Sequence, residues 1–329
     1  MKTSKYVLEI TVFVCGAVVM VYELVGSRIL GPYFGTSVFV WTGLIGTIMG
    51  SLSLGYYLGG VLADRSPKIK TLSSIIFLSS IFVLITFLIK DSVLVFFQQI
   101  FFDVNTPTVV ASLILFSPAS VLLGMVSPYA AKIKLNSLNI SGKTIGNLYA
   151  LSTGGSIFGT FISGYFLIPH FGTNKLLLIL SCALLFVSFM LSSYRTKRNN
   201  FIIIFILLIS LFFLMYVRLP FNKKLLADVD TAYNRIWIYD RKDKTTGDAV
   251  RLMSINNENS SAMYLEKNTL VFEYTKYYDL AEHFFPNFRS TLMLGGAGYS
   301  YPKYFLNKYP EATMDVVEID SDITKLAEK

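Results

Sequence analysis

The chain has 329 residues, of which 53% are hydrophobic and only 15% are charged, whereas soluble domains usually carry about 25% charged residues. The charge deficit lies almost entirely in residues 1–220, which excludes a single water-soluble globular domain and divides the chain near that point. The net charge of +8 comes mostly from short loops between apolar runs, without a basic stripe interleaved with aromatics, so no nucleic-acid partner is expected.

Apolar runs in residues 1–220 predict a multi-pass membrane domain of about seven helices. A helix needs about 20 apolar residues to cross ~30 Å of hydrocarbon. The runs that reach or approach this length are about 6–30, 38–63, 72–89, 108–130, 145–169, 174–193 and 200–219. The stretch 91–107 is expected to lengthen the third helix or to lie in the membrane interface. The lipid bilayer is therefore the first expected partner, and the first run is too long for a cleavable signal peptide.

Loop charges orient this predicted bundle in the plasma membrane. Basic residues gather in alternate loops, at Lys2 and Lys5, at Arg65, Lys68 and Lys70, at Lys132, Lys134 and Lys143, and at Arg195, Lys197 and Arg198. The other loops hold no basic residue at 31–37, and Lys90 and Lys175 singly. The positive-inside rule then predicts a cytoplasmic N-terminus. Seven crossings would leave the C-terminal domain outside.

Two ionisable residues, Glu23 and Arg28, lie in the first apolar run. They are five residues apart, about 140° around a helix, so they cannot pair on one face. Arg28 lies near the helix end, from where its side chain reaches the interface. Glu23 is an intramembrane candidate for function, because ionisable groups are costly there. Two roles stay open for it, pairing with another helix and binding a substrate or a proton.

Glycines are frequent on two predicted helices, with Gly43, Gly46 and Gly50 followed by Gly55 and Gly59 on one and Gly155 and Gly159 on the other. Several of these glycines are four residues apart. This spacing lets helix backbones approach closely, so it favours plain bundle packing. A hinge for transport is the alternative.

The loop 60–70, with the sequence GVLADRSPKIK, resembles the loop signature of the major facilitator transporters. It departs from that signature at Pro67, where the family prefers glycine. In that family the loop is cytoplasmic, which agrees with the orientation that the loop charges predict. Seven helices are too few for a complete transporter of this kind.

Cysteine and histidine usage indicates neither a disulfide framework nor a metal site. Cys15 and Cys182 both lie in apolar runs and are expected to be buried as small hydrophobic residues. His170 and His283 stand alone in the sequence. No metal ligands are therefore predicted.

From Asp228 onward, short strands and turns replace the apolar runs. Residues 233–240 alternate and are rich in aromatics, and a second strand at 250–255 follows a polar turn. These strands predict a β-hairpin within a small β region at 221–275. A helix is expected over 272–285.

Residues 276–329 predict the start of a Rossmann-like α/β domain. A short buried strand at 291–294 leads into a glycine loop at 295–298, and a helix follows from Pro302, which suits a first helical position, to about Lys308. A second strand, 314–317, comes next. Two acidic residues stand at its end, Glu318 and Asp320.

This order of elements is typical of a nucleotide-binding unit. Glycines let the backbone approach the ligand, and an acid at the end of the second strand binds ribose hydroxyls. The predicted nucleoside-binding residues are Gly295, Gly296, Gly298, Glu318 and Asp320. The third glycine of the dinucleotide fingerprint is absent, since residue 301 is Tyr, so an S-adenosylmethionine-type nucleoside is favoured over NAD. No covalently bound cofactor is expected, and a strand-turn-helix without any ligand is the alternative.

The tail resembles the spermidine synthases, which are polyamine aminopropyltransferases, and the whole chain is similar to their bacterial membrane-fused members. The segments that carry the resemblance are YELVGSRILGPYFGTSVFVWTG, LGYYLGGVLADR, LYALSTGGSIFGTFISGYFLIPHFG and DTAYNRIWIYD. The resemblance implies a helical bundle followed by a class I S-adenosylmethionine-type domain. It also implies transferase activity with a decarboxylated S-adenosylmethionine-like donor and a polyamine as partner.

The resemblance implies that the glycine loop and Glu318 bind the nucleoside. It implies the same role for Asn234, which stands where the family has a Gln. Two family features are missing. The aspartate that holds the donor's aminopropyl end falls at Gly298, and the acceptor-side Tyr-His-Glu falls at 274–276, which read Tyr-Thr-Lys. The family's catalytic aspartate lies beyond the matching segment, and the sequence stops at Lys329. No catalytic residue is therefore predicted, and a truncated chain or a second chain that completes the α/β domain is expected.

Three hypotheses follow from these patterns. The first is a membrane-anchored aminopropyltransferase-type enzyme. The second is a polytopic transporter or sensor with a non-catalytic nucleoside-binding tail. The third is a structural membrane subunit whose soluble part needs another polypeptide.

Overall fold

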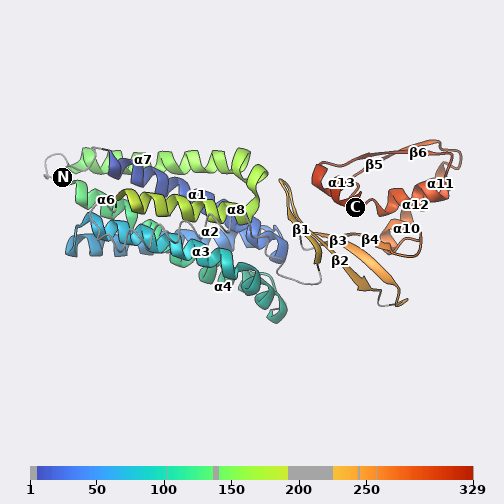
Figure 1. The fold of residues 1–329 in the computed structure, drawn as a ribbon, viewed down its shortest axis with the longest axis horizontal. Coiled ribbons are helices and arrows are strands. Elements are labelled where there is room, and N and C mark those ends of the chain that lie inside the picture. Colours follow the sequence, from blue (N-terminus) through green and yellow to red (C-terminus); the bar gives the residue numbers. More distant parts are fainter. Residues whose placement is uncertain are drawn as a thin grey trace. The chain divides into compact units, whose positions relative to one another are not determined.

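The computed structural model describes residues 6–101, 103–135, 141–191, 225–243, 245–256 and 258–328. The chain divides into two compact units, Met1–Arg218 and Leu219–Lys329. The described part of the first unit is helical, and every described strand belongs to the second unit (Figure 1).

The first unit is a bundle of long apolar helices that run back and forth (Figure 1). Its elements are α1 (Val7–Phe34), α2 (Val38–Arg65), α3 (Ile69–Ile100), α4 (Asn105–Leu115), α5 (Ser117–Gly124), α6 (Val126–Lys134), α7 (Ser141–Ile162), the π-helix η2 (Ser163–Leu167) and α8 (Ile168–Leu191). By length and composition, 4 described helices can cross a membrane, or up to 5 if the bent series α4–α6 counts as one span.

The described helices differ from the predicted spans in two places. The run 108–130 is not one straight helix, because it forms α4, α5 and α6 with a bend of 53° before Ser117. Pro118 in the next turn lacks the N–H that would continue the helical hydrogen bonds. The runs 145–169 and 174–193 fall in one helical stretch, in which Gly172 (φ 68°, ψ 170°) breaks the helix and the ribbon doubles back (Figure 1). The run 200–219 lies outside the described residues.

Glycines set the closest helix contacts. Gly155 and Gly159 of α7 face α1 so closely that an added Cβ would overlap the α1 backbone. Gly55 and Gly59 of α2 face the backbone of residues 121–125 in the same way. At these positions the four-residue spacing gives the close packing that it predicts, whereas an added Cβ at Gly46 or Gly50 would meet open space.

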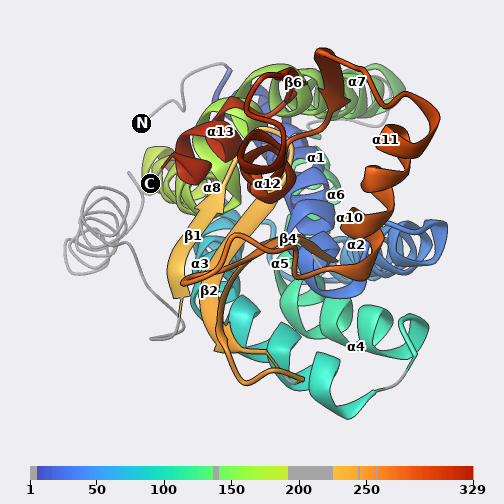
Figure 2. The ribbon, with the colours of Figure 1, turned by 90° about the vertical axis from the view of Figure 1, so that its right-hand side faces the viewer.

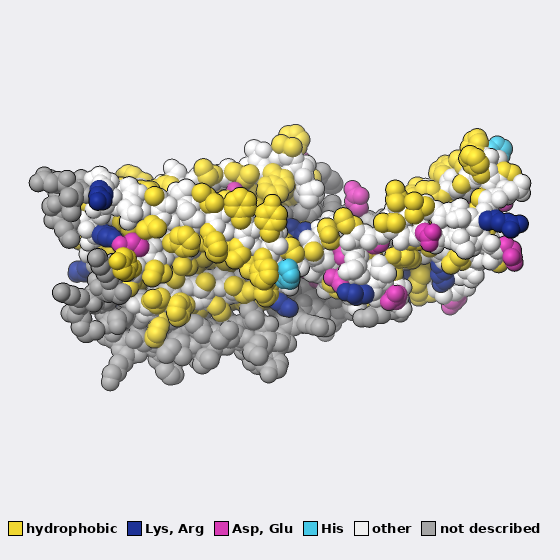
Figure 3. All heavy atoms as spheres, turned by 90° about the horizontal axis from the view of Figure 1, so that it is seen from above, with side chains coloured by type: hydrophobic (Ala, Val, Ile, Leu, Met, Phe, Trp, Pro, Cys, Tyr) yellow, Lys and Arg dark blue, Asp and Glu magenta, His cyan; other side chains and the backbone are white. Residues whose placement is uncertain are grey.

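Two ion pairs tie helix ends together at one end of the bundle. Lys134 at the end of α6 pairs with Glu9 at the start of α1, and Lys132 pairs with Asp64 near the end of α2 at 2.6 Å. The basic ends of α2 and α6 and the start of α1 therefore lie at the same end of the bundle, as the alternation of loop charges predicts. In Figure 3, Lys and Arg side chains lie at the left end of the bundle, while hydrophobic side chains cover much of its visible face.

Large apolar side chains cover the outside of the bundle. Phe39 is 65% exposed, Tyr57 is 70% exposed and Phe161 is 59% exposed. Contiguous apolar surface of this extent is rare on soluble monomers. It is compatible with a multi-pass membrane protein.

The second unit begins with an antiparallel sheet in the order β1-β2-β3-β4. Strands β1, β2 and β4 of this sheet are labelled near the centre of Figure 2. Its strands are β1 (Leu225–Asp230), β2 (Arg235–Lys242), β3 (Ala249–Ile255) and β4 (Glu258–Tyr264). β2 and β3 form the hairpin that the sequence predicts. The outer strands were not predicted, since β4 is largely polar.

A βαβ segment follows, with β5 (Ser290–Leu294), α12 (Ser300–Lys308) and β6 (Thr313–Val317), and then α13 (Ser321–Ala327). β5 and β6 pair in parallel. The predicted helix at 272–285 is instead three short pieces, α10 (Glu273–Lys276), the 3-10 turn η4 (Tyr277–Asp279) and α11 (Leu280–Phe284). The described residues thus contain one βαβ segment, and a larger Rossmann-like domain stays a prediction.

Three apolar clusters hold the described part of this unit together, and one of them is formed by Val250, Leu252 and Ala262 within the four-stranded sheet. Tyr301 and Phe305 of α12 pack with Leu270 under β5 and β6. Ile323 of α13 packs against Ile236 of the four-stranded sheet. The opposite face of the two-stranded sheet is open among the described residues, since Leu294 is 78% exposed. Parallel sheets are normally covered on both faces. A second chain or a further segment that would cover the open face of this sheet stays a prediction.

Candidate functional site

The loop after β5 has an unusual backbone. Gly295, Ala297 and Tyr299 have φ values of 88°, 43° and 54°, which lie in the left-handed region. Positive φ is uncommon for a non-glycine residue and is found at binding loops more often than elsewhere. Alternation of left-handed and ordinary residues makes successive backbone N–H groups converge into an anion-binding concavity.

Glu318 fills this concavity with its own carboxylate. Oε2 accepts hydrogen bonds from the N–H groups of Gly296 at 2.8 Å and Ala297 at 3.1 Å, and Oε1 accepts one from the N–H of Asp320 at 3.1 Å. Partial burial raises the pKa of the Glu318 carboxyl, but these backbone hydrogen bonds outweigh burial and lower the pKa below its ordinary value. The glycine loop and the strand-end acid are therefore together, and the acid is ionised at neutral pH.

Asp320 is buried and hydrogen-bonded within the protein. It is 2% exposed, and its Oδ2 accepts a hydrogen bond from the hydroxyl of Thr231 at 2.5 Å. Its Oδ1 accepts one from the N–H of Asp322, as the N-cap of α13. Both oxygens are engaged inside the protein, and Asp320 joins the two sheets of this unit.

Asn234 lies at the turn between β1 and β2, where the hydroxyl oxygen of Thr231 accepts a hydrogen bond from the N–H of Asn234 at 2.9 Å. The side-chain oxygen of Asn234 accepts a hydrogen bond from the amide of Asn256 at 3.0 Å. Thr231 therefore places the Asn234 turn next to Asp320. The structure describes no contact between Asn234 and the glycine loop.

Gly298 approaches the four-stranded sheet. An added Cβ would lie 2.8 Å from the hydroxyl oxygen of Ser261 on β4. The same Ser261 hydroxyl lies 2.9 Å from the hydroxyl of Ser300 at the start of α12. An aspartate, the residue expected here from the spermidine synthases, would not fit unless β4 moved.

The residues at the acceptor-side positions form local contacts. The Tyr274 hydroxyl donates to the carbonyl of Ser260, the Thr275 hydroxyl donates to the carbonyl of Phe272, and Lys276 pairs with Glu273. These three contacts stabilise the short helices after β4.

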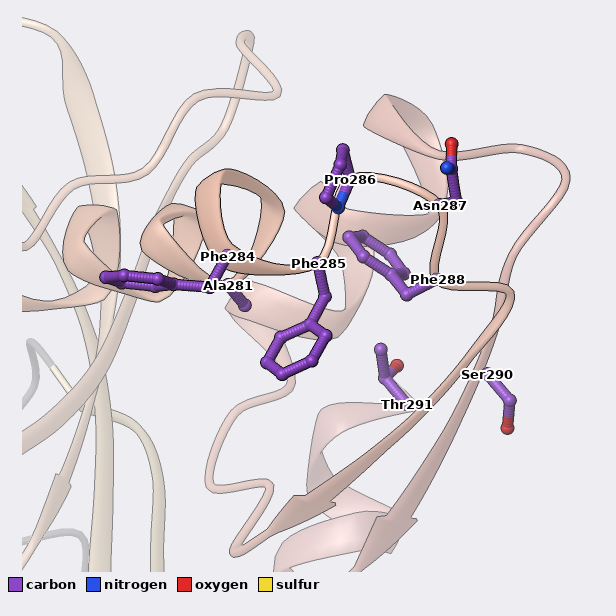
Figure 4. A pocket seen from close by; sticks show the side chains of 8 residues that line it. All are labelled: Ala281, Phe284, Phe285, Pro286, Asn287, Phe288, Ser290 and Thr291. Atoms are coloured by element: carbon purple, nitrogen blue, oxygen red, sulfur yellow. The ribbon is translucent and has the colours of Figure 1, made fainter.

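An open pocket of about 610 Å³ lies at the other end of β5. It is lined by Ala281, Phe284, Phe285, Pro286, Asn287, Phe288, Ser290 and Thr291, and in Figure 4 the rings of Phe284 and Phe285 project in different directions. Ser290, which lines the pocket, is the first residue of β5, whereas the glycine loop follows Leu294, the last residue of β5. Ligands of open α/β sheets bind outside the carboxyl ends of the strands, so this pocket is separate from the predicted site.

In the bundle, Glu23 and Arg28 are both half-buried on α1. Within the described residues, no hydrogen bond or ion pair joins them. A different charged group is more deeply buried in the bundle and was not predicted, because Lys90 was expected in a loop. That placement is wrong: Lys90 and Asp91 lie inside α3, are 1% and 5% exposed, and pair at 2.7 Å, while the hydroxyl of Tyr33 donates to Asp91 at 2.8 Å. The expectation that the stretch 91–107 lengthens the third helix is confirmed as far as Ile100, and this extension places the pair inside α3.

Histidine and cysteine form no metal site in the part of the chain that the structure describes, where no three His, Cys, Asp or Glu side chains gather. His170 stacks on Phe166 and His283 packs against Phe284. Cys15 is buried and Cys182 is half-buried, both as free thiols.

The geometry thus defines an apolar helical bundle joined to a small α/β unit that has a carboxylate at its glycine loop. No known protein family matches the chain, and neither the curated proteins nor the solved structures contain a match.

Proposed function

We propose that the chain is a multi-pass plasma-membrane protein whose C-terminal unit binds an S-adenosylmethionine-type nucleoside, as in a spermidine synthase-like aminopropyltransferase. The observation that carries the proposal is the contact between Glu318 and the glycine loop at the carboxyl ends of β5 and β6. Ligands of α/β units bind at this edge. The resemblance to the spermidine synthases adds the substrate class.

The charge at the loop favours a cationic nucleoside over a nucleotide. Dinucleotide-binding loops hold pyrophosphate with their backbone N–H groups. Here the N–H groups of Gly296 and Ala297 already donate to the Glu318 carboxylate. A phosphate would lose these donors and meet a negative charge, whereas the sulfonium of an S-adenosylmethionine-type donor would be attracted.

The capacity of Glu318 limits how it can hold a ribose. A carboxylate has about four acceptor sites. Three are filled by backbone N–H groups, which leaves one on Oε1. One ribose hydroxyl can therefore donate to Glu318 directly, and a second would have to displace a loop amide.

The implied chemistry is aminopropyl transfer. A deprotonated acceptor amine attacks the carbon next to the sulfonium, the carbon–sulfur bond breaks, and methylthioadenosine leaves while a base takes the amine proton. Donor and acceptor must be held about 3 Å apart for this step. We assign no base among the described residues, so the proposal for this chain is nucleoside binding.

Isothermal titration of the full-length protein in detergent tests the proposal. Decarboxylated S-adenosylmethionine and methylthioadenosine are expected to bind, and NAD is expected not to bind. Glu318→Gln should weaken binding at least about tenfold, because a neutral amide replaces the charge-assisted acceptor. Asp315→Asn, on the same strand and exposed, is the matched control. Absence of heat with both nucleosides would remove the proposal.

A transporter or sensor is the second candidate. The observation that favours it is the ion pair between Asp64, in the loop that resembles the major facilitator signature, and Lys132 of another helix. Uptake of a radiolabelled diamine into proteoliposomes would test it, with Asp64→Asn as the variant. Uptake no faster than into empty liposomes would reject this candidate.

For the topology, we propose that the basic end of the bundle faces the cytoplasm. A crossing by the run 200–219 would then place the C-terminal unit outside. Ser321 is exposed, so Ser321→Cys offers a probe for a membrane-impermeant maleimide in intact cells. Labelling without permeabilisation is expected, and labelling only after permeabilisation would put this unit in the cytoplasm.

A further inference from the structure

Glu23 on α1 and Ser163 directly after α7 have no hydrogen-bond partner among the described residues, as is also true of the buried Ser112 hydroxyl on α4. The hydroxyl of Ser163 is 0% exposed and bonds to no other described residue. Glu23 is half-buried, and none of the described residues gives it a hydrogen bond or an ion pair. Burial without a partner costs about 1–3 kcal/mol for a hydroxyl and more for a carboxylate. Such groups call for a partner that the described residues do not supply.

The helix register places Glu23 and Ser163 at the same level. α1 and α7 run in the same direction, and the hydroxyl of Ser156 donates to the carbonyl of Gly16 at 3.2 Å. Glu23 lies seven residues after Gly16, and Ser163 lies seven residues after Ser156. Seven residues are about two helical turns and return to within ~20° of the same face. Glu23 and Ser163 therefore both lie at the α1–α7 interface, two turns beyond this hydrogen bond.

The helix changes form at this level. Ser163 is the first residue of the π-helix η2, and η2 contacts both α1 and α8. Single π-helical turns within α-helices occur frequently at functional sites. The next residue, Gly164, has open space at its side-chain position. The irregular turn and the unpaired hydroxyl therefore coincide.

The depth of Glu23 makes a counter-charge necessary. Along α1 it is 14 residues, about 21 Å, from Glu9 at the basic end, and ten residues, about 15 Å, from Tyr33 near the other end. Lys134 is held by Glu9, and Lys90 is held by Asp91. An ionised carboxylate in the apolar middle of a bundle needs a positive partner.

We propose that Glu23 and Ser163 form a binding site for a small monovalent cation, either an alkali ion or a primary ammonium group. The carboxylate supplies the charge, and the hydroxyl oxygen supplies a second ligand. An ammonium group has three donors for these oxygens, and Na⁺ is held by oxygen ligands of the same kind. The site lies in the helical unit and is independent of nucleoside binding at the glycine loop.

Thermal unfolding of the full-length protein in neutral detergent tests the site. Choline chloride is replaced at constant ionic strength by NaCl or by methylammonium chloride. The expected result is a rise of at least about 2 °C in the unfolding midpoint with one of these salts. Glu23→Gln should abolish the rise, and Ser163→Ala should reduce it by half or more. Ser156→Ala, on the same face of α7, and Glu9→Gln, on the same helix, should keep it.

The outcomes separate the possibilities. A rise with NaCl alone identifies an alkali-ion site, and a rise with methylammonium alone identifies an ammonium site. No rise with either salt in the wild type overturns the proposal, as does a rise that persists in Glu23→Gln. A midpoint that depends on pH and on neither salt shows only a protonated carboxyl and also overturns it. If Glu23→Gln does not fold, a full response in Ser163→Ala is decisive against the site.

Discussion

Removal of the Glu318 carboxylate should open the glycine loop. Glu318→Ala leaves the N–H groups of Gly296 and Ala297 without the acceptor that they contact at 2.8 and 3.1 Å. Each such hydrogen bond contributes about 1 kcal/mol net, and water can replace part of it because Glu318 is only partly buried. We expect a local loss of about 1–2 kcal/mol. This loss corresponds to a factor of about 5–30 in the equilibrium between closed and open loop.

Hydrogen exchange of the full-length protein measures this equilibrium directly. The amides of Gly296 and Ala297 should exchange about 5–30 times faster in Glu318→Ala at neutral pH, after correction for intrinsic rates. Asp315→Asn is the control on the same strand, and its exchange should match the wild type. Unchanged protection of both loop amides in Glu318→Ala would refute the assignment of the carboxylate as their partner.

The same contact has a defined pH dependence. The pKa of Glu318 in the folded protein lies below the ordinary value of 4.5. A carboxyl with a depressed pKa contributes stability that is complete above its unfolded pKa and is lost as the pH falls through its folded pKa. Loop protection should therefore be constant at neutral pH and fall only below about pH 4.5 in the wild type, with no such fall in Glu318→Ala.

The remaining predictions concern packing and buried charge, and each is read from the thermal unfolding midpoint in detergent. Gly155→Leu should destabilise the bundle by about 1–3 kcal/mol because the site faces backbone, whereas Gly154→Leu meets open space and should have little effect; equal effects would contradict the α1–α7 contact. Asp91→Asn should cost about 3–5 kcal/mol because it leaves Lys90 buried without its anion, and an unchanged midpoint would show that the pair is not buried. Thr231→Val should cost about 1–3 kcal/mol, since the buried carboxylate at the N-cap of α13 loses its hydroxyl donor; a neutral effect would argue against this link between the two sheets.

Hydropathy predicted the long helices well where each one crosses the bundle without interruption. α1 and α2 follow the runs 6–30 and 38–63 within a few residues. Hydropathy did not predict the bend at Pro118, because a proline in the first turn of a helix is compatible with a straight span as well as with a break. Lys90 was placed in a loop because a lone lysine in an apolar run is typical of a helix end. Its pairing with Asp91 depends on the neighbouring helices.

The parallel strands and the glycine loop could be predicted because they depend on local order along the chain. The orientation of Glu318 could not, since it follows from the left-handed backbone at Ala297 and Tyr299, two residues for which sequence favours no such conformation. β4 was missed because Asn259, Ser260 and Ser261 give no apolar alternation. The sequence also could not predict that Glu23 and Ser163 lie at the same height along the bundle, because this depends on how α1 and α7 pack together.

The pairing of α1 with α7 also bears on biosynthesis. The α1 backbone at Phe13 contacts Gly155, which is synthesised 142 residues later. At about 5–20 residues per second, the ribosome needs roughly 7–28 s to make the partner of the first helix. During that interval the face of α1 at Phe13 and Ala17 lacks the glycines of α7 that it later packs against. A chain whose synthesis stops before α7 would therefore contain α1 without the helix that packs most closely against its backbone.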